Sequence, residues 1–242
     1  MLKTCVKLRR FCTIVNSSGA QKLRNITRVW FTPLPPDSKF IKPCRLHFIE
    51  NGVEKDRDII KIRDGLMILI YNVTRKKLVL VRQFRAAVYH GIISGNTLDI
   101  PEGDVDLKLF PPELGVTLEL CAGMVDKQKS LEEIAREEVL EECGYDVPVD
   151  SILPIYKYRS GIGASSGGHF LYYCEVNDSQ KVASGGGVHD EVIEVVELSI
   201  DEVECFVQSG TEINGAPGLL VAFLWFLANK ASKYRACCAN DN

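Results

Sequence analysis

The chain has 242 residues and a formal net charge of −3, with 29 lysines and arginines against 32 acidic residues. This balance lacks the basic footprint of a nucleic-acid-binding protein, so no nucleic acid is expected as a partner. No apolar run approaches the roughly 18 residues that suggest a membrane-spanning helix, so no membrane association is predicted. A hydrophobic content of 46% is ordinary for a globular chain of this length.

The first 36 residues contain lysines and arginines but no acidic residue. Such a composition is typical of a poorly ordered basic extension and equally of a mitochondrial transit peptide. We therefore expect a cytoplasmic protein, with a mitochondrial location as the alternative. Nine cysteines without metal-ligand spacing indicate buried thiols in a reducing compartment. The proline-rich stretch at residues 32–36 predicts a stiff linker and a boundary.

Residues 37–62 form the next region, which is predicted to be a β-hairpin. Two strand-like segments, 45–50 and 53–60, flank Asn51-Gly52, and this dipeptide is a strong signal for a tight hairpin turn. Because an isolated hairpin is only marginally stable in water, this one is expected to need a surface to pack on.

Two β-rich runs follow at residues 65–72 and 77–83, and the second is predicted to continue into Arg85 and Tyr89. Residues 97–114 are rich in Pro, Gly and Asp and predict a long loop. Further strands are predicted at 117–122, 152–158, 169–176 and 192–198. Gly- and Ser-rich segments predict loops at 160–168 and 184–187, the second of them flexible.

A helix with clear end signals is predicted from Leu131 to about Glu142. Ser130 and Glu133 have the spacing of a capping box, and Gly144 supplies a residue suited to the left-handed conformation that ends a helix. Two more helices are predicted at 200–209 and 217–231, the latter apolar and covering a sheet, with Trp225 in the core. Strands mixed with helices indicate an α/β protein of α-β-α sandwich type.

Three carboxylates share one face of the helix that begins at Leu131. Glu138, Glu141 and Glu142 are spaced i, i+3 and i+4, where like charges repel one another. A solvated acidic surface is one interpretation of such a cluster. The other is a hard divalent cation such as Mg²⁺, which binds carboxylate oxygens and keeps water ligands for a phosphate substrate.

The spacing of the surrounding residues resembles the Nudix box, GX5EX7REUXEEXGU, in which U is a bulky apolar residue. The matching positions are Gly123, Glu138, Val139, Glu141, Glu142, Gly144 and Tyr145. Two positions depart from the pattern, because Lys129 stands where the family has Glu and Glu137 where it has Arg, with Arg136 one place early. In the family these two positions form an ion pair that braces the loop against the helix. We expect Lys129 and Glu137 to form the same brace with reversed polarity.

Two further stretches, VRQFRAAVY at 81–89 and ELCAG at 119–123, resemble the ADP-ribose and sugar-nucleotide diphosphatase branch of this family. Over roughly residues 40–230 the resemblance is greatest to the animal uridine diphosphate glucose pyrophosphatases. It implies a Nudix α-β-α sandwich with a mixed sheet at residues 63–232, followed by a tail at 233–242. It also implies that the hairpin region contributes to a homodimer.

The resemblance implies a metal site for Mg²⁺, with Mn²⁺ as the alternative. Its ligands would be the carbonyl of Ala122 and the carboxylates of Glu138, Glu141, Glu142 and Glu191. Glu119 would support this site from behind. Gly123 and Gly144 would have structural roles in the box.

The general base that activates water is expected in the loop before the last strand. Glu191 falls where the family has a metal-binding Glu, and His189 stands where some relatives have the base. His189, Asp190 or Glu191 could take the proton, with Glu141 assisting through a second ion or a bridging water. A histidine has the most suitable ordinary pKa of these groups.

For the substrate, Arg85 is expected to meet the diphosphate, since a guanidinium matches phosphate oxygens. A surface ion pair is the alternative interpretation of this residue. Arg159 and Ser165 are weaker candidates in the Gly-rich loop.

The expected activity is metal-dependent hydrolysis of UDP-glucose to UMP and glucose 1-phosphate. ADP-ribose is the alternative substrate, although other branches of the family place a Glu in the 160–168 loop and this chain has none there. A catalytically silent nucleotide-binding module is the alternative from another class, suggested by Lys129 and Glu137.

Overall fold

A computed structural model describes residues 26–38, 41–95, 102–210 and 214–236. At its centre is a seven-stranded sheet in which β11, β5, β4, β10 and β9 lie in that order, with β7 paired to β5 and β8 to β4. The β4–β10 pair is parallel, whereas the other pairs are antiparallel. The strands are β4 (Gly65–Asn72), β5 (Lys77–Phe84), β7 (Val116–Glu119), β8 (Cys121–Met124), β9 (Leu153–Ser160), β10 (Gly167–Val176) and β11 (Ile193–Ser199).

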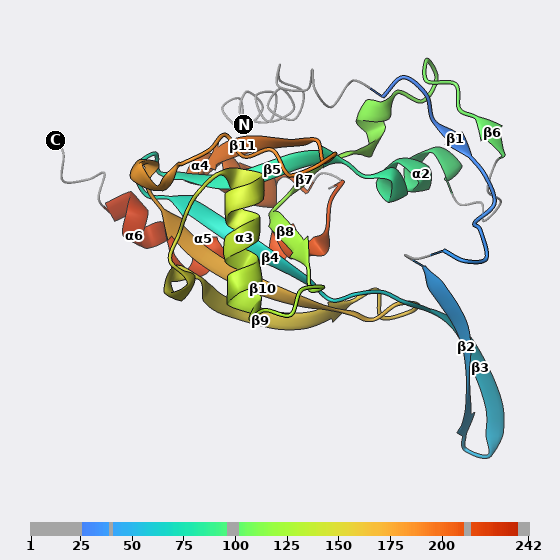
Figure 1. The fold of residues 1–242 in the computed structure, drawn as a ribbon. Helices are drawn as coiled ribbons and strands as arrows, with labels where there is room; N and C mark the ends of the chain where they lie inside the picture. Colours follow the sequence, from blue (N-terminus) through green and yellow to red (C-terminus); the bar gives the residue numbers. More distant parts are fainter. Residues whose placement is uncertain (1–25, 39–40, 96–101, 211–213, 237–242) are drawn as a thin grey trace.

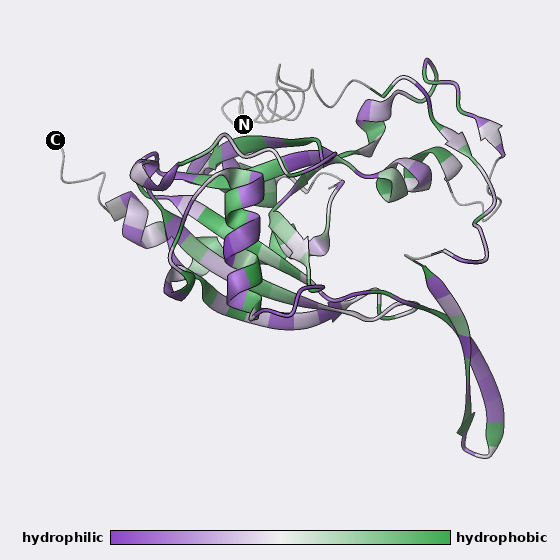
Figure 2. Cartoon of the chain, in the orientation of Figure 1, coloured by the Kyte–Doolittle hydropathy of each residue, from purple (hydrophilic) through white to green (hydrophobic). Residues whose placement is uncertain are grey.

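Helices cover both faces of this sheet (Figure 1). One face packs against α3 (Leu131–Cys143), and the other against α4 (Ile200–Gln208) and α5 (Pro217–Asn229). Successive side chains of β4 point alternately into the hydrophobic core on each face of the sheet. They are buried almost throughout the strand because helices cover both faces of the sheet. Figure 2 shows the apolar residues concentrated in these central strands. The predicted α/β class and α-β-α sandwich are confirmed.

The Asn51-Gly52 hairpin is also present, as β2 (Lys42–Glu50) and β3 (Val53–Lys61). Both turn residues have positive φ, 54° and 78°, as a two-residue hairpin turn requires. The hairpin extends away from the sandwich (Figure 1), and most of its side chains are exposed. The division of the chain into an extension, a hairpin region, a Nudix domain and a tail stays a prediction.

The helix at Leu131 has the ends that the sequence predicts. The Ser130 hydroxyl accepts a hydrogen bond from the Glu133 amide, and the Glu133 carboxylate accepts one from the Ser130 amide. Gly144 is left-handed, with φ of 72°. The later helices are also close to prediction, although a kink at Lys230 separates α5 from a short α6 (Ala231–Ala236). Trp225 is only partly buried and packs at the edge of the core.

The prediction for residues 85–122 is wrong in three places. Strand β5 ends at Phe84, and the next segment is a helix, α2 (Ala86–Ser94), which begins at good helix-forming alanines. The described part of the predicted loop contains β6 (Gly103–Asp104), paired with β1 (Trp30–Phe31), and a 3-10 turn, η2 (Pro112–Gly115). The single strand predicted at 117–122 is two strands, because the chain changes partner from β5 to β4 at Leu120.

Cysteine burial follows the prediction at three of the five described positions. Cys121, Cys143 and Cys174 are buried and Cys205 partly so, whereas Cys44 is exposed on the hairpin, so the prediction is wrong there. The other cysteines, and most of the basic extension, lie outside the described residues. In the described chain we find no helix long and apolar enough to cross a membrane.

The glycine-rich segment 184–187 is not the free loop that the sequence predicts. The amides of Gly186 and Gly187 donate to the carbonyls of Glu142 and Glu141 at 2.9 and 3.1 Å, so the segment satisfies the last turn of α3. The Lys181 ammonium donates to the Cys143 carbonyl at 2.6 Å, where a cation also complements the helix dipole. The segment that leads to Glu191 is therefore fastened to the helix that carries the carboxylates.

Gly185 provides a test of this attachment. Its φ is +72°, and a Cβ there would collide with the Glu142 carbonyl oxygen, whereas Gly210 has φ of +61° with open space around it. Gly210→Ala should cost about 1 kcal/mol for the left-handed conformation alone. Gly185→Ala should cost roughly 3 kcal/mol or more, because steric collision adds to that strain. Urea unfolding measures both, and equal losses would show that the segment simply moves away.

Candidate active site

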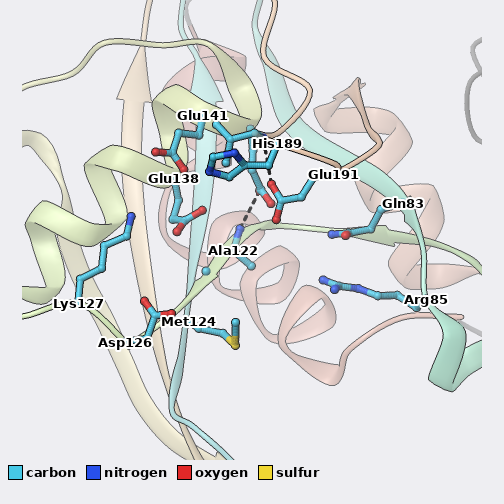
Figure 3. Close-up of a pocket in the computed structure, with 13 residues that line it drawn as sticks. Gln83, Arg85, Ala122, Met124, Asp126, Lys127, Glu138, Glu141, His189 and Glu191 are labelled. Atoms are coloured by element: carbon cyan, nitrogen blue, oxygen red, sulfur yellow. Dashed lines mark hydrogen bonds between the residues drawn. The ribbon is translucent and has the colours of Figure 1, made fainter. Parts of the chain in front are cut away.

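A cavity of about 490 Å³ lies where α3 meets the ends of β5 and β8. Figure 3 shows how side chains from separate strands, loops and α3 face this space. Its lining consists of Gln83 and Arg85 at the end of β5, Ala122, Gly123 and Met124 in β8, Asp126 and Lys127 in the loop before α3, Glu138, Glu141 and Glu142 on α3, and Val188, His189 and Glu191 in the loop before β11.

Strand β8 positions two of the three helix carboxylates. Glu142 is only 4% exposed, and its Oε2 accepts a hydrogen bond of 3.0 Å from the Ala122 amide. Glu138 lies directly against Gly123, where an added Cβ would collide with its carboxylate. A glycine is therefore required at 123 to let the helix carboxylates approach the strand.

Burial disfavours the negative charge of these carboxylates. It raises the pKa of Glu138 to about 7, and the neighbouring charge of Glu141 acts in the same direction. Burial also raises the pKa of Glu142 to about 8, although the hydrogen bond from Ala122 lowers it. The protein thus concentrates acidic groups where they resist ionisation, which is typical of a site that binds a positive charge.

The donor set fits a hard divalent cation, because every candidate ligand is an oxygen. Ala122, Glu138, Glu141, Glu142 and Glu191 all line the cavity. In the described part of the chain, no group of three or more His, Cys, Asp or Glu side chains stands close enough together to hold a metal ion by itself. A cation bound among these donors would take its remaining ligands from water and substrate.

The loop before β11 brings two of the three candidate bases to the cavity. Glu191 accepts a hydrogen bond from the Val188 amide at 3.1 Å, which fixes its carboxylate over the α3 cluster (Figure 3). His189 also lines the cavity, with a positive φ of 55°. Asp190 does not line it. This loop geometry favours Glu191 and His189 over Asp190 as the group that accepts a proton.

Arg85 forms an ion pair and also lines the cavity. Its guanidinium makes a two-point ion pair with Glu119, with N–O distances of 2.8 and 2.6 Å, and hydrogen bonding to Glu119 raises the pKa of Arg85. Its side chain still lines the cavity and is 45% exposed. Glu119 thus lies behind Arg85 and orients it. The Glu119 carboxylate also accepts a hydrogen bond from the Thr117 hydroxyl.

Arg159 and Ser165 are not brought to this cavity. The loop between β9 and β10 closes on itself, with Arg159 donating to the Ser166 carbonyl at 3.0 Å and Ser165 to the Gly161 carbonyl at 3.5 Å. The loop is also tied to the base of the hairpin, because the Gly168 amide donates to Asp64 at 2.8 Å. These local contacts hold both candidates away from the α3 carboxylates.

The two departures from the Nudix pattern form an ion pair with each other. Lys129 donates to Oε1 of Glu137, and Lys127, which the sequence analysis did not single out, donates to Oε2 at 2.8 Å. These hydrogen bonds, the one from Lys127 first, lower the pKa of Glu137 to about 2. Arg136 instead pairs with Asp146. The loop is thus connected to α3 despite the reversed polarity, which removes the basis for a silent module.

Gln83, Met124, Asp126 and Lys127 are lining residues that sequence reasoning missed. A local signal existed for Lys127, since it is a second cation within the short loop that carries Lys129. Gln83 lies two residues after the buried Val81 on β5 and therefore points to the same, α3-covered face of the sheet. The sequence does not show which strands lie beside β5, so it does not show that this face of β5 borders the cavity.

The sandwich and its carboxylate-lined cavity define a hydrolase of Nudix type. Uridine diphosphate glucose pyrophosphatase NUDT14 of Mus musculus is 37% identical over 200 residues, which cover 79% of this chain and 90% of that protein. The Bos taurus counterpart is 36% identical over the same coverage. GDP-mannose pyrophosphatase of Salmonella typhi is 35% identical over 71% of this chain and 78% of its own length.

No family model matches the chain. The extent of these similarities nevertheless establishes its membership. The chain belongs to the Nudix hydrolases, in their group of sugar-nucleotide pyrophosphatases.

The raised pKa values predict how pH affects the metal-free protein. Glu138 and Glu142 hold their protons to about pH 7 and 8 when folded, but ionise near 4.5 when unfolded. Their stabilising contribution is therefore complete below about pH 4.5 and is lost as pH rises through 7 to 8. Glu142→Gln should remove part of this loss, measured as unfolding free energy at several pH values.

A divalent cation should reverse this loss of stability at higher pH, because the carboxylates that bind the cation must be ionised. Added Mg²⁺ should raise the melting temperature more at about pH 8 than at about pH 5.5, and Glu142→Gln should lose most of that gain. Asp150→Asn, on the exposed surface, is the control and should behave like the unmodified protein. A cation effect that is independent of Glu142 would contradict this assignment.

Proposed function

We propose that this protein hydrolyses the diphosphate bond of a nucleoside diphosphate sugar, with UDP-glucose as substrate and UMP and glucose 1-phosphate as products. The observation that carries the proposal is the convergence of the α3 carboxylates, Glu191 and Arg85 on one cavity. The named activities of the relatives, on UDP-glucose and on GDP-mannose, support the substrate class. The greater coverage and identity of the UDP-glucose enzymes favour UDP-glucose.

The residues that would hold Mg²⁺ are the oxygen donors of the cavity, namely Ala122, Glu138, Glu141, Glu142 and Glu191. When bound, Mg²⁺ neutralises charge on phosphoryl oxygens and acidifies a coordinated water. Mn²⁺ suits the same ligands. Mg²⁺ is the preferred cation here because it retains water ligands and binds phosphate oxygens through few protein carboxylates.

The protein's own side chains then position the substrate and handle the proton. Arg85, held in orientation by Glu119, binds an oxygen of the diphosphate through its exposed N–H groups. Glu191 takes the proton of the attacking water, because its carboxylate is fixed over the cavity by the Val188 amide. His189 is the second candidate for this step, since it faces the same space (Figure 3).

The experiment that tests this function is release of phosphate-bearing products from UDP-glucose, GDP-mannose and ADP-ribose, with Mg²⁺ and with a chelator. UDP-glucose should be cleaved fastest, and chelation should stop the reaction. Glu142→Gln should reduce turnover by more than the roughly 10- to 100-fold that loss of an outer-shell partner costs. Its circular dichroism spectrum should be unchanged. Faster cleavage of another sugar nucleotide would change the substrate assignment, and no cleavage would contradict the enzymatic role.

We further propose that hairpin β2–β3 pairs with a second copy of the chain. Its register places Cys44, Leu46, Phe48, Val53 and Ile59 on one face, where Glu50, Lys55 and Arg57 also lie. Leu46 and Val53 are 52% and 58% exposed, so the apolar side chains of this face are poorly covered by the described residues. The opposite face carries ion pairs such as Arg45–Asp58 and exposed apolar side chains such as Ile49. A hairpin with exposed apolar side chains gains stability by burying them against a partner.

Leu46→Asn should therefore shift the protein from dimer to monomer in analytical ultracentrifugation. His47→Asn is the matched control, because His47 is the next residue of the same strand but lies on the opposite face. It should leave the dimer intact. A monomeric unmodified protein, or equal effects of the two substitutions, would contradict the proposal.

A further inference from the structure

Two lysines share one carboxylate at the rim of the cavity. Lys129 donates to Oε1 of Glu137 and Lys127 donates to Oε2, so each ammonium uses a separate oxygen. One such ion pair is enough to connect the loop to α3, and Lys129 provides it. Glu137 with both lysines carries a net charge of +1, so the second cation is not required for charge balance within the brace.

The two lysines differ in where they lie. Lys127 lines the cavity and Lys129 does not. The nearby charges of Glu141 and Glu138 contribute to raising the pKa of Lys127, after the hydrogen bond to Glu137, so its ammonium is within electrostatic reach of the carboxylate cluster. Its side chain is 37% exposed, which leaves it accessible from the cavity.

Lys127 also has hydrogen-bonding capacity to spare. An ammonium has three N–H donors, and within the described chain Glu137 is its one hydrogen-bond partner. A flexible four-carbon stem allows the ammonium to turn toward a ligand while Lys129 keeps Glu137 in place. The Glu137 carboxylate therefore keeps an ion-pair partner when Lys127 turns away from it.

Figure 3 shows Lys127 and Arg85 on opposite sides of the carboxylate cluster. Arg85 is held by its two-point pair with Glu119, whereas the Lys127 ammonium makes one hydrogen bond, to Glu137, among the described residues. A diphosphate has two anionic groups, and a cavity with a cation on each side of its metal ligands offers a partner for each.

We propose that Lys127 is a substrate-binding residue, which moves from Glu137 to one phosphate of the diphosphate while Arg85 binds the other. This inference rests on the proposed function for the identity of the substrate, but binding of a diphosphate can be tested without turnover. Lys127 takes no part in proton transfer and forms no covalent bond. Its contribution is to bind and orient one phosphate group.

The test compares Lys127→Met with Lys129→Met, which each remove one of the two lysines from Glu137. The probe is inorganic pyrophosphate, titrated calorimetrically into the full chain in the presence of Mg²⁺. Lys127→Met should weaken pyrophosphate binding by about tenfold or more, the typical effect of one charge-assisted hydrogen bond. Lys129→Met should leave the affinity unchanged but lower the free energy of unfolding. Lys127→Arg should retain most of the affinity.

Product inhibition identifies the phosphate involved. In Lys127→Met, inhibition by either UMP or glucose 1-phosphate should weaken while inhibition by the other is retained. Unchanged pyrophosphate affinity in Lys127→Met, or equal weakening in Lys129→Met, would overturn the proposal and assign Lys127 to the brace alone. If the unmodified protein binds pyrophosphate through Lys127 but does not cleave UDP-glucose, the proposed function fails and this inference stands.

Discussion

Repulsion between carboxylates on one helix face is the constraint on which the site depends. Glu138, Glu141 and Glu142 lie together at a partly buried cavity, where burial and the charges of neighbouring carboxylates raise the pKa values of Glu138 and Glu142. An isolated helix would be destabilised by this spacing. The fold holds the carboxylates in place from the strand side, through the Ala122 amide and the absence of a side chain at Gly123. Strain of this kind is characteristic of a binding site.

The same helix organises the loop that completes the cavity. Its last carbonyl groups, which have no partner within the helix, accept hydrogen bonds from Gly186, Gly187 and Lys181. The helix end therefore determines where Glu191 lies relative to the α3 carboxylates. Glycine is needed at position 185 because the chain there passes too close to the helix for a side chain. The same hydrogen bonds thus satisfy the end of α3 and position the loop before β11.

The reversed brace shows that the geometry of an ion pair can be retained when both charges change sign. Lys129 and Glu137 connect the same two segments that the family pattern connects with Glu and Arg. An exposed pair of this kind contributes only about 0–1 kcal/mol, so its value is in fixing the loop rather than in stabilising the whole fold. Lys129 stands where the family pattern has a glutamate, and a second lysine of the same loop, Lys127, lines the cavity.

The sequence by itself determined the elements whose signals are local. The capping box at Ser130, the Asn51-Gly52 turn and the uninterrupted apolar strand β4 were all predictable, because hydrogen bonds and periodicity within a short stretch decide them. Only the tertiary structure decided which residues share the cavity. Lys127 enters it and Arg159 does not, because strand pairing and loop closure between distant segments set those positions. The break at Leu120 has the same origin, since two different partner strands compete for one stretch of chain.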